Sequence, residues 1–361
     1  MARVLMAMSG GVDSSTGGYL LKERGYEVTG AFMRLLGDYE PHPDRKACCS
    51  AQDIEDARQA ATRLDFNFLV FNFQVAFQTE VIAPFAKAYA QGLTPNPCLE
   101  CNRRLKFQRF LERAKILGHD YMATGHYARV EYDPQRKRYL LKKALDLTKD
   151  QSYALYTMTQ EELSQTLFPL GEVTKPEIRR LAGKLNLAAA TKPDSQDICF
   201  VPNGRYTDFL TDYLTTQGLK PQPGRLVDRQ GNQLGEHKGI HHFTVGQRKG
   251  LNIQKPGPWY VLELNPLTHE VVVGPIEELG QKEALVTDLN YIAFETLTAP
   301  IKVMAKIRYR QTEIPALLSP HPKGAVLTFQ KPPKGVSPGQ AAVFYEGDTV
   351  LGGGSIAREK P

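Results

Sequence analysis

The stretch Val4-Leu5-Met6-Ala7-Met8-Ser9-Gly10-Gly11-Val12-Asp13-Ser14 (residues 4–14) decides the fold, because it joins a buried strand to a helix through glycines. The run Val4–Met8 is continuously apolar, as in strands that are covered on both faces of a sheet. A helical pattern follows from Asp13 to Arg24 and stops at Gly25. This order is typical of an open α/β sheet, in which ligands bind at the carboxyl ends of the strands.

The same alternation of strand and helix continues along the chain. Mostly apolar strands that alternate with helices predict a parallel sheet covered by helices on both faces, as in Rossmann-like folds. The further strand patterns are Val28–Leu36, Asn67–Phe73 and Tyr121–Ala128. The further helix patterns are 50–64 with Ser50 as its cap, 75–90, 105–117, and 174–185 with a capping box formed by Thr174 and Glu177.

The composition changes after residue 201. Proline and glycine recur between short β-rich runs, preceded by a helix pattern at Tyr206–Leu214, and from about Lys282 the chain is nearly all short strands. We therefore expect an α/β catalytic domain over residues 1–201, a small mixed central domain over 202–280 and a C-terminal β-barrel over 281–361.

The bulk composition is that of a globular protein of 361 residues, with 42% hydrophobic residues and a net charge of +6. The sequence shows neither a membrane span nor a signal peptide, so we expect a cytoplasmic protein that is not membrane-bound. Its cysteines number 5, too few for a disulfide scaffold of this length. Basic residues gather around 103–113, 136–143 and 302–310, which suits an extended polyanion, although each cluster alone is more simply a solvated face.

The turn Ser9–Ser14 (SGGVDS) is a candidate phosphate-binding loop. Its glycines allow backbone N–H groups to approach an anion, and the helix that follows adds its dipole. Neither the Walker A pattern, with its lysine, nor the G-x-G-x-x-G pattern is present. The plainer alternative is a turn in which glycine only relieves strain. SGGVDS resembles the pyrophosphate loop of the N-type ATP pyrophosphatases, which implies ATP, with Mg²⁺, bound by Ala7, Met8, Ser9, Gly10, Gly11, Val12, Asp13 and Ser14.

Two further positions belong to the same expected edge of the sheet. In folds like that of the ATP pyrophosphatases the adenine lies near the end of the second strand, which makes Met33 a candidate contact, although a core methionine is as plausible. Gly125 and His126 close the Tyr121–Ala128 pattern, and a histidine there can contact a nucleotide or a substrate.

The stretch Thr94-Pro-Asn-Pro-Cys-Leu-Glu-Cys-Asn102 places rigid prolines directly before Cys98 and Cys101. A metal clip, a disulfide and a catalytic sulfur all remain open from this pattern alone. Arg103, Arg104 and Lys106 are expected to lower the pKa of nearby thiols, which favours a nucleophile. A zinc site would need two more ligands, which the adjacent pair Cys48-Cys49 supplies poorly.

Six motifs along the chain together resemble the tRNA-uridine 2-sulfurtransferases, the tRNA-specific 2-thiouridylase (MnmA/TrmU) family. They are SGGVDS, TPNPCLECN, TGHYAR, LKKALDLTKDQSYAL, SQDICF and GQRKGL. The resemblance covers essentially the whole chain.

This resemblance implies a reaction at the wobble uridine of tRNA. ATP adenylates the C2 oxygen, and Cys199 carries a persulfide received from a sulfur-donor protein. The persulfide sulfur goes to C2 as AMP leaves, and Cys101 is the second catalytic cysteine, which forms a transient disulfide with Cys199. We expect the protein to act as a monomer.

The resemblance also implies residues that contact tRNA, and a central domain that touches it. The target base must leave its stack to reach the site. The tRNA-contacting residues are Asn96, Pro97, Cys98, His126, Lys149, Asp150, Gln151, Arg308, Tyr309 and Gln340. For Lys149–Gln151 a helix cap at Asp150 is the plainer alternative, and for Arg308-Tyr309 a solvated strand face.

One residue departs from the family pattern. Many members have an aspartate where this chain has Cys98, so a general-base role for that aspartate does not transfer. Three thiols, Cys98, Cys101 and Cys199, could instead hold an iron–sulfur cluster, which is a minority hypothesis. Apart from that cluster, no metal site is expected in the chain.

Two other functions remain as alternatives. One is an amide-forming ligase of the ATP pyrophosphatase type, which leaves the cysteines unexplained. The other is a non-enzymatic tRNA-binding module, which leaves the intact SGGVDS loop unexplained.

Overall fold

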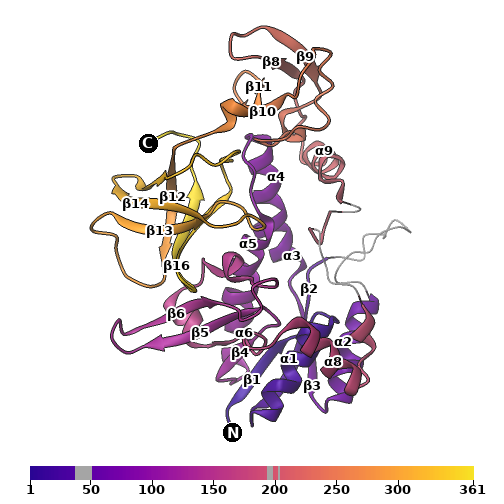
Figure 1. The fold of residues 1–361 in the computed structure, drawn as a ribbon. Coiled ribbons are helices and arrows are strands. Elements are labelled where there is room, and N and C mark those ends of the chain that lie inside the picture. Colours follow the sequence, from indigo (N-terminus) through magenta and orange to yellow (C-terminus); the bar gives the residue numbers. More distant parts are fainter. Residues whose placement is uncertain (37–50, 193–197, 202–203) are drawn as a thin grey trace.

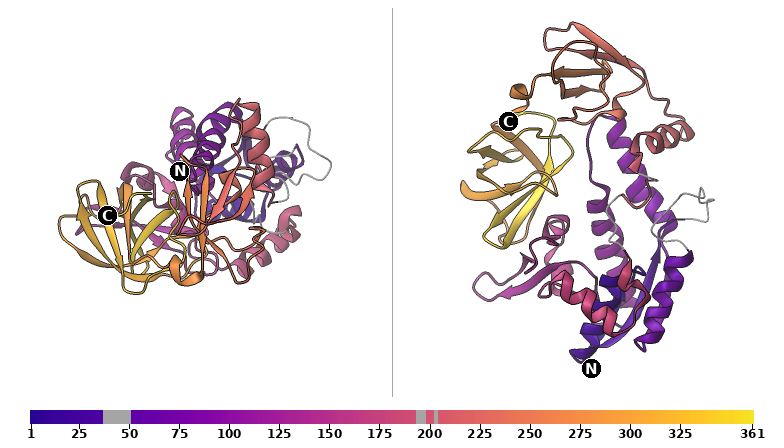
Figure 2. Two further views of the ribbon diagram at one scale, coloured as in Figure 1. Left: turned by 90° about the horizontal axis from the view of Figure 1, so that it is seen from above. Right: turned by 45° about the vertical axis from the view of Figure 1, so that its right-hand side comes forward.

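The computed structural model describes residues 1–36, 51–192, 198–201 and 204–361 of the chain. Figure 1 shows an α/β part at the bottom, a barrel of strands at one side and a small central domain at the top. The two further views in Figure 2 show that the long helical segment ending in α4 (Ala83–Ala90) reaches from the α/β part to the central domain. The expected fold class is confirmed.

The α/β part is built on a sheet in which every neighbouring pair of strands is parallel. The strand order is β3-β2-β1-β4-β7. Because β1 is in the middle and is almost wholly apolar, it is buried from Val4 onward. The strands are β1 (Arg3–Ala7), β2 (Glu27–Arg34), β3 (Asn67–Asn72), β4 (Tyr121–Ala123) and β7 (Thr166–Leu167).

Helices cover this sheet as the alternation predicts. The helix after β1 is α1 (Val12–Glu23), and α8 (Lys175–Lys184) begins with the predicted capping box of Thr174 and Glu177. The proposed cap Ser50 lies outside the described residues. The other helices are α2 (Ala51–Arg63), α7 (Gln160–Ser164), the continuous run of α3 (Gln74–Phe77), the π-helical η1 (Gln78–Ile82) and α4, and the run of α5 (Pro97–Glu100), the π-helical η2 (Cys101–Phe110) and α6 (Leu111–Ile116).

The helix after TPNPCLECN begins eight residues earlier than the predicted residue 105, at Pro97. Asn96 caps it, because its Oδ1 accepts a hydrogen bond of 3.0 Å from the N–H of Cys98. Proline is well suited to the first helical position, since it has no N–H to satisfy there. Both Cys98 and Cys101 are therefore helical residues and do not belong to a turn that precedes the helix.

The predicted strand Tyr121–Ala128 is wrong in its second half. β4 ends at Ala123, and the chain turns away to form the hairpin of β5 (Ala128–Asp133) and β6 (Arg138–Lys143). This hairpin belongs to the sheet of the C-terminal barrel, because β6 pairs with β17 (Thr349–Ile356) through Val350 and Leu141.

Six antiparallel strands form the barrel, which closes where β12 pairs with β17. Apolar residues alternate inward along the strands and form one core, as the sequence predicts. The strands are β12 (Glu283–Tyr291), β13 (Ile301–Lys306), β14 (Ile314–His321), β15 (Gly324–Phe329), β16 (Ala341–Glu346) and β17.

The central domain has its own small core around Val261 and Val271. Its elements are α9 (Tyr206–Thr216) and the sheet of β8 (Gly224–Val227), β9 (Gln233–His237), β10 (Tyr260–Asn265) and β11 (Glu270–Gly274). In the part of the chain that the structure describes, no helix is both long and apolar enough to cross a membrane.

Candidate functional site

The loop between β1 and α1 has the geometry of an anion site. Gly11 occupies the cap position of α1 without a capping side chain, which leaves the first N–H groups of the helix open. Ser14 shapes the loop from inside, since its Oγ accepts from the N–H of Ser9 at 3.1 Å and donates to the carbonyl of Gly11 at 3.2 Å. Open N–H groups at a helix N-terminus are a ready site for phosphate.

Two glycines hold this loop against its neighbours. Gly10 has a φ of +74°, and a Cβ there would lie 2.5 Å from the carbonyl oxygen of Asp53 in α2. Gly125 packs on the other side, where a Cβ would lie 2.9 Å from the backbone nitrogen of Ser14. Neither position has room for a side chain, so the loop, α2 and the segment after β4 form one close-packed unit.

Asp13, the single acidic residue of the loop, is fully engaged. Nζ of Lys175 lies 2.7 Å from both of its carboxylate oxygens, and the hydroxyl of Tyr127 donates to Oδ1 at 2.8 Å. Lys175 is the first residue of α8 and is only 6% exposed. The sequence predicts only a helix start at this segment. A lysine in the first turn of a helix is unfavourable, and this was the available signal for a buried partner.

The other residues predicted to contact the nucleotide lie at the carboxyl ends of β1 and β2. Ala7 ends β1, Met8 follows it, and Met33 lies near the carboxyl end of the neighbouring β2. Met33 is partly buried and packs on the largest apolar core, so its position fits either a nucleotide contact or a core methionine.

The two cysteines of TPNPCLECN differ in environment. Cys98 is exposed, whereas Cys101 is buried in the largest core. Burial raises the pKa of the Cys101 thiol, and the nearby Lys106 only partly opposes this. The expected lowering of its pKa by basic neighbours is therefore wrong for Cys101, because desolvation outweighs the charge of Lys106.

Cys199 lies in a short described segment that an aromatic cluster anchors. The ring of Phe200 packs on Phe77 at 5.6 Å, on Phe85 at 5.4 Å and on Phe209 at 5.3 Å. Cys199 packs partly buried against the same apolar core that contains Cys101. The structure thus brings the two predicted catalytic cysteines to one core, although nearly 100 residues separate them in sequence.

Several residues predicted to contact tRNA converge at the junction of the α/β part and the barrel. Nε2 of Gln340 donates to the carbonyl of Thr94 at 2.6 Å, next to the Asn96-Pro97 turn. The hydroxyl of Tyr309 lies 3.5 Å from the carbonyl of Asp150, and the charge of Cys98 acts on its phenol. Burial is the main cause that raises the pKa of Tyr309.

The segment Lys149–Gln151 is partly structural. The carboxylate of Asp150 accepts hydrogen bonds from the N–H of Ala144 and from Ser152. The plainer alternative of a helix cap at Asp150 is wrong, because the 3-10 helix Ser152–Leu155 has Gln151 at its cap position. Oε1 of Gln151 accepts from the N–H of Tyr127, which ties this segment to the strand that follows His126.

Arg308 does not lie on a solvated strand face, as the plainer alternative suggested. Its guanidinium donates to the carbonyls of Val245 and Gly335 and to the hydroxyl of Ser337, at 2.8–3.0 Å. It therefore joins the central domain to the barrel, and burial lowers its pKa from the usual value.

His126 follows β4 and is held by Thr124, whose Oγ1 lies 2.7 Å from Nδ1. Its ring packs beside Phe107 and Phe168. Burial and the charge of Lys106 hold the pKa of His126 well below its usual value, so the imidazole is neutral. A neutral imidazole recognises a ligand by hydrogen bonding and not by charge.

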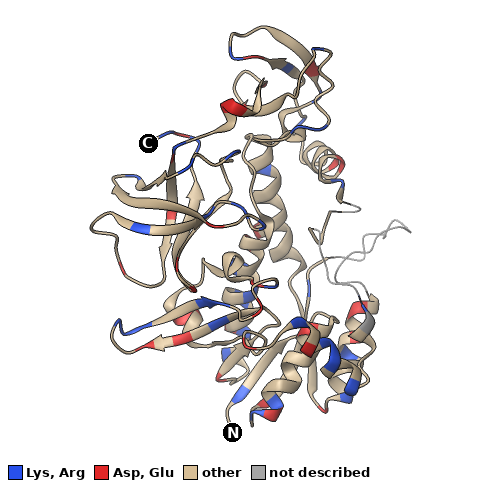
Figure 3. Cartoon of the chain, in the orientation of Figure 1, with Lys and Arg blue, Asp and Glu red and all other residues tan. Residues whose placement is uncertain are grey.

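The basic clusters do not form one free cationic face. Figure 3 shows acidic residues interspersed with basic ones along the β5–β6 hairpin. Lys142 pairs there with Glu131, and Lys143 pairs with Glu313. In the first cluster Arg104 pairs with Glu100. Much of the positive charge noted in the sequence thus stabilises contacts within the protein.

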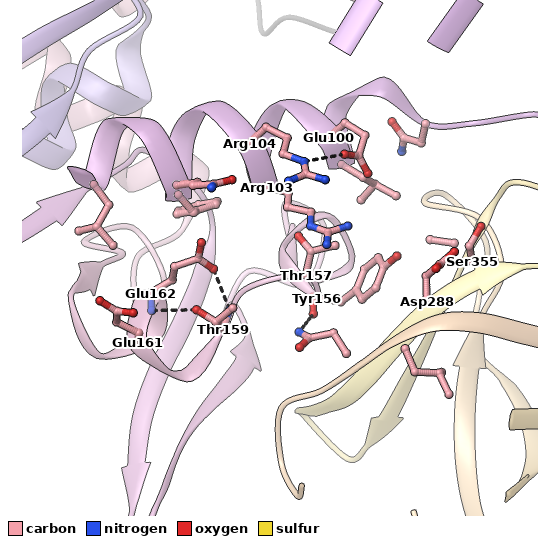
Figure 4. A pocket seen from close by; sticks show the side chains of 18 of the residues that line it. Glu100, Arg103, Arg104, Tyr156, Thr157, Thr159, Glu161, Glu162, Asp288 and Ser355 are labelled. Atoms are coloured by element: carbon pink, nitrogen blue, oxygen red, sulfur yellow. Dashed lines mark hydrogen bonds and ion pairs between the residues drawn. The ribbon is translucent and has the colours of Figure 1, made fainter. Parts of the chain in front are cut away.

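A groove of about 790 Å³ runs between the helix α5–α6 and the barrel. In Figure 4 Arg103 and Tyr156 face this groove from one side and Asp288 from the other. Neither Cys98 nor Cys101 lines it, so it is a neighbour of the thiols and not their pocket.

The donors do not assemble a metal cage. In residues 1–36, 51–192, 198–201 and 204–361 no group of three or more His, Cys, Asp or Glu is arranged to hold a metal ion. Cys98, Cys101 and Cys199 therefore do not form a ligand set in this conformation. A magnesium ion that arrives with ATP takes most of its ligands from phosphate and water, so it needs no such cage.

Comparison with family models covers the chain in three consecutive stretches. Residues 2–203 match the model described as tRNA methyl transferase HUP domain, residues 207–275 match its PRC-barrel domain, and residues 281–356 match the aminomethyltransferase beta-barrel domain.

Curated relatives match over nearly the full length and carry the name tRNA-specific 2-thiouridylase MnmA. The protein of Heliobacterium modesticaldum is 47% identical over 98% of this chain and 92% of its own. That of Acidobacterium capsulatum is 46% identical over 98% of both chains, and that of Halothermothrix orenii 47% identical over 99% of both.

Proposed function

This chain belongs to the tRNA-specific 2-thiouridylase family, and we propose that it converts the wobble uridine of tRNA anticodons to 2-thiouridine with ATP. The observation that supports this best is the open phosphate loop between β1 and α1, where no side chain caps the first N–H groups of the helix. Such a loop suits the pyrophosphate of ATP, and Cys101 and Cys199, which pack on one apolar core, suit sulfur transfer.

The first step activates a poor electrophile. The C2 oxygen of uridine attacks the α-phosphorus of ATP, and pyrophosphate leaves. The loop Ser9–Ser14 holds the phosphates through the uncapped N–H groups at the start of α1, and the dipole of α1 stabilises the negative charge. Magnesium bound with ATP would neutralise charge on the departing pyrophosphate.

The second step transfers sulfur from a persulfide on Cys199, which a donor protein loads. The terminal sulfur attacks C2 and AMP leaves, so that the base is joined to Cys199 through two sulfurs. The thiolate of Cys101 then attacks Sγ of Cys199. The sulfur stays on the base as a thiocarbonyl, and the Cys101–Cys199 disulfide is reduced by an external thiol.

The buried state of Cys101 fits this order of events. A thiol whose pKa is raised stays protonated until the substrate opens its surroundings, which protects the persulfide from premature attack. Asn96 caps the helix that carries Cys98 and Cys101, and Gln340 donates to Thr94 beside this cap. A flipped base bound at this junction would have to expose Cys101, which is buried in the structure.

The test is nucleoside mass spectrometry of tRNA that has been incubated with the protein, ATP and a persulfide donor. We expect 2-thiouridine, and we expect its complete loss in Cys199→Ser. Full turnover by Cys199→Ser would favour the amide-forming ligase, and the absence of tRNA-dependent pyrophosphate release would favour a binding module.

The cluster alternative has a separate readout. Anaerobic purification followed by iron and acid-labile sulfide analysis should give neither at stoichiometric level. Stoichiometric iron that is lost in Cys98→Ser would replace the persulfide route with a cluster held by Cys98, Cys101 and Cys199.

A further inference from the structure

The phosphate loop lacks the lysine that Walker loops carry, yet a lysine reaches it from a distant helix. Lys175 of α8 places its ammonium 2.7 Å from both oxygens of Asp13, which is 162 residues away. The side chain of Lys175 is 7% exposed and that of Asp13 is 30% exposed. The pair therefore lies under the first turn of α1, with the carboxylate nearer to solvent.

The placement of Lys175 is unfavourable in two respects. A lysine is seldom buried unless it is paired, and the N-terminus of a helix repels cations. Lys175 is the first residue of α8, and its backbone N–H donates to Asp146 at 3.0 Å. Because helix stability alone would select against a cation here, its partner Asp13 is the reason for its position.

Asp13 without a partner would harm an anion site in two ways. Its negative charge at the N-terminus of α1 would repel a polyphosphate. Acidic side chains in a first helical turn also tend to accept hydrogen bonds from the free N–H groups of that turn. Lys175 neutralises the charge, and together with Tyr127 it turns both oxygens away from those N–H groups, since α1 has no side-chain cap.

We propose that Lys175 is a positioning residue of the ATP site, which acts by holding and neutralising Asp13 so that the loop stays open to the triphosphate. This inference rests on the proposed function, because it takes ATP as the ligand of the loop. It differs from a Walker lysine, which contacts the phosphates itself.

The experiment measures the affinity of the full chain for ATP, AMP and adenosine by titration calorimetry. In Lys175→Met the affinity for ATP should fall about 10- to 100-fold, as expected for one uncompensated charge near a polyanion. The affinity for AMP should fall less, and that for adenosine should change by less than about 2-fold, because adenosine has no charge to repel. Lys175→Arg should retain most of the affinity for ATP.

The double variant Asp13→Asn/Lys175→Met decides how Lys175 acts. If the lysine acts through Asp13, removal of both charges should restore ATP affinity to within about 3-fold of the wild type. A double variant as weak as Lys175→Met would show a direct contact with phosphate and overturn the proposal. If Lys175→Met lost affinity for adenosine as much as for ATP, the loop would have collapsed, and this result would also overturn the proposal.

Two controls separate this result from misfolding and from failure of the proposed function. Lys115→Met removes another lysine–carboxylate pair, the contact with Glu161, and should leave the affinity for ATP unchanged. The thermal midpoint of each variant shows whether it is folded. A wild type that binds no ATP overturns the proposal, whereas ATP binding without 2-thiouridine formation overturns only the proposed function.

Discussion

At the scale of residues, Cys98 and Cys101 lie one helical turn apart but differ in exposure. Cys98 is exposed, and burial raises the pKa of Cys101. Only the thiolate is alkylated, so both the access and the ionisation of Cys101 are limited. The two thiols should therefore react with an alkylating reagent at different rates, although they lie only one helical turn apart.

We predict that brief treatment with iodoacetamide at neutral pH alkylates Cys98 at least about 10-fold faster than Cys101. Because the pKa of Cys101 is raised, its rate of alkylation should increase at pH values above the usual pKa of a thiol. In denaturant, Cys101 and Cys98 should be alkylated at equal rates. Peptide mass spectrometry measures both rates, with Cys98→Ser as the control. Equal rates in the folded protein would contradict the burial of Cys101.

A second prediction concerns Gly10. Gly10→Ala should weaken ATP binding about 100-fold or more, because the new Cβ meets the carbonyl of Asp53 and must displace the loop or α2. The matched control is Gly218→Ala, which has a φ of +75° but nothing within 4 Å of the added carbon. Calorimetric titration with ATP should leave Gly218→Ala unaffected apart from about 1 kcal/mol of stability.

The sequence indicated the loop but not all of the residues that make it work. SGGVDS after a buried strand is a local pattern, so the sequence alone predicts a phosphate-binding loop there. The pairing of Asp13 with Lys175 and Tyr127 is not local, and neither partner lies in a pattern that requires it. The acidity of Cys101 was predicted wrongly for the same reason, because the charges near it are visible in the sequence whereas its burial depends on the tertiary fold.

At the scale of elements, the helix α5–α6 shows how boundaries are missed. Asn96 followed by Pro97 is a sound helix start, but the two prolines of TPNPCLECN also fit a rigid turn before a later helix. The prediction of one strand over Tyr121–Ala128 is wrong for another reason. Tyr121–Ala123 belongs to the parallel sheet, whereas Ala128 begins a strand of the barrel sheet. No periodicity in the sequence marks the point where the chain passes from one sheet to the other.

Arg308, two residues after β13, yields a third prediction. Arg308→Met should lower the free energy of unfolding by about 2–3 kcal/mol, because the carbonyls of Val245 and Gly335 lose a charged donor. Chemical denaturation measures this change. Arg310→Met, an exposed neighbour, serves as the control. If Arg308→Met weakened tRNA binding with unchanged stability, its role would be contact with RNA and not the joining of domains.

At the scale of the whole molecule, the parts are joined by contacts that cross the expected boundaries. The β5–β6 hairpin of the α/β part extends the barrel sheet through β17. Nε of Arg138 donates to the carbonyl of Ile292, and the hydroxyl of Tyr153 donates to the carbonyl of Ala341. The order of three architectures was predictable from composition, but this sharing of a sheet between remote segments was not.

The fourth prediction follows from this sharing. A chain that ends at residue 280 should fail to form a stable α/β part, because β6 loses its partner strand and Tyr153 is uncovered. Thermal unfolding by circular dichroism and size-exclusion chromatography should show a lowered midpoint and aggregation relative to the full chain. A truncated chain that unfolds cooperatively at the wild-type midpoint would show that the two parts are independent.

The pairing of β6 with β17 also bears on the order of events on the ribosome. Because β17 comprises residues 349–356, the β5–β6 hairpin lacks its partner strand until more than 200 further residues have been translated. A nascent chain can form the parallel sheet early, but the junction of Thr94 with Gln340 and the pairing of β6 with β17 form only after residues 340 and 349–356 are made. Incomplete translation products therefore lack an assembled site and are left with an exposed strand edge that chaperones and proteases can recognise.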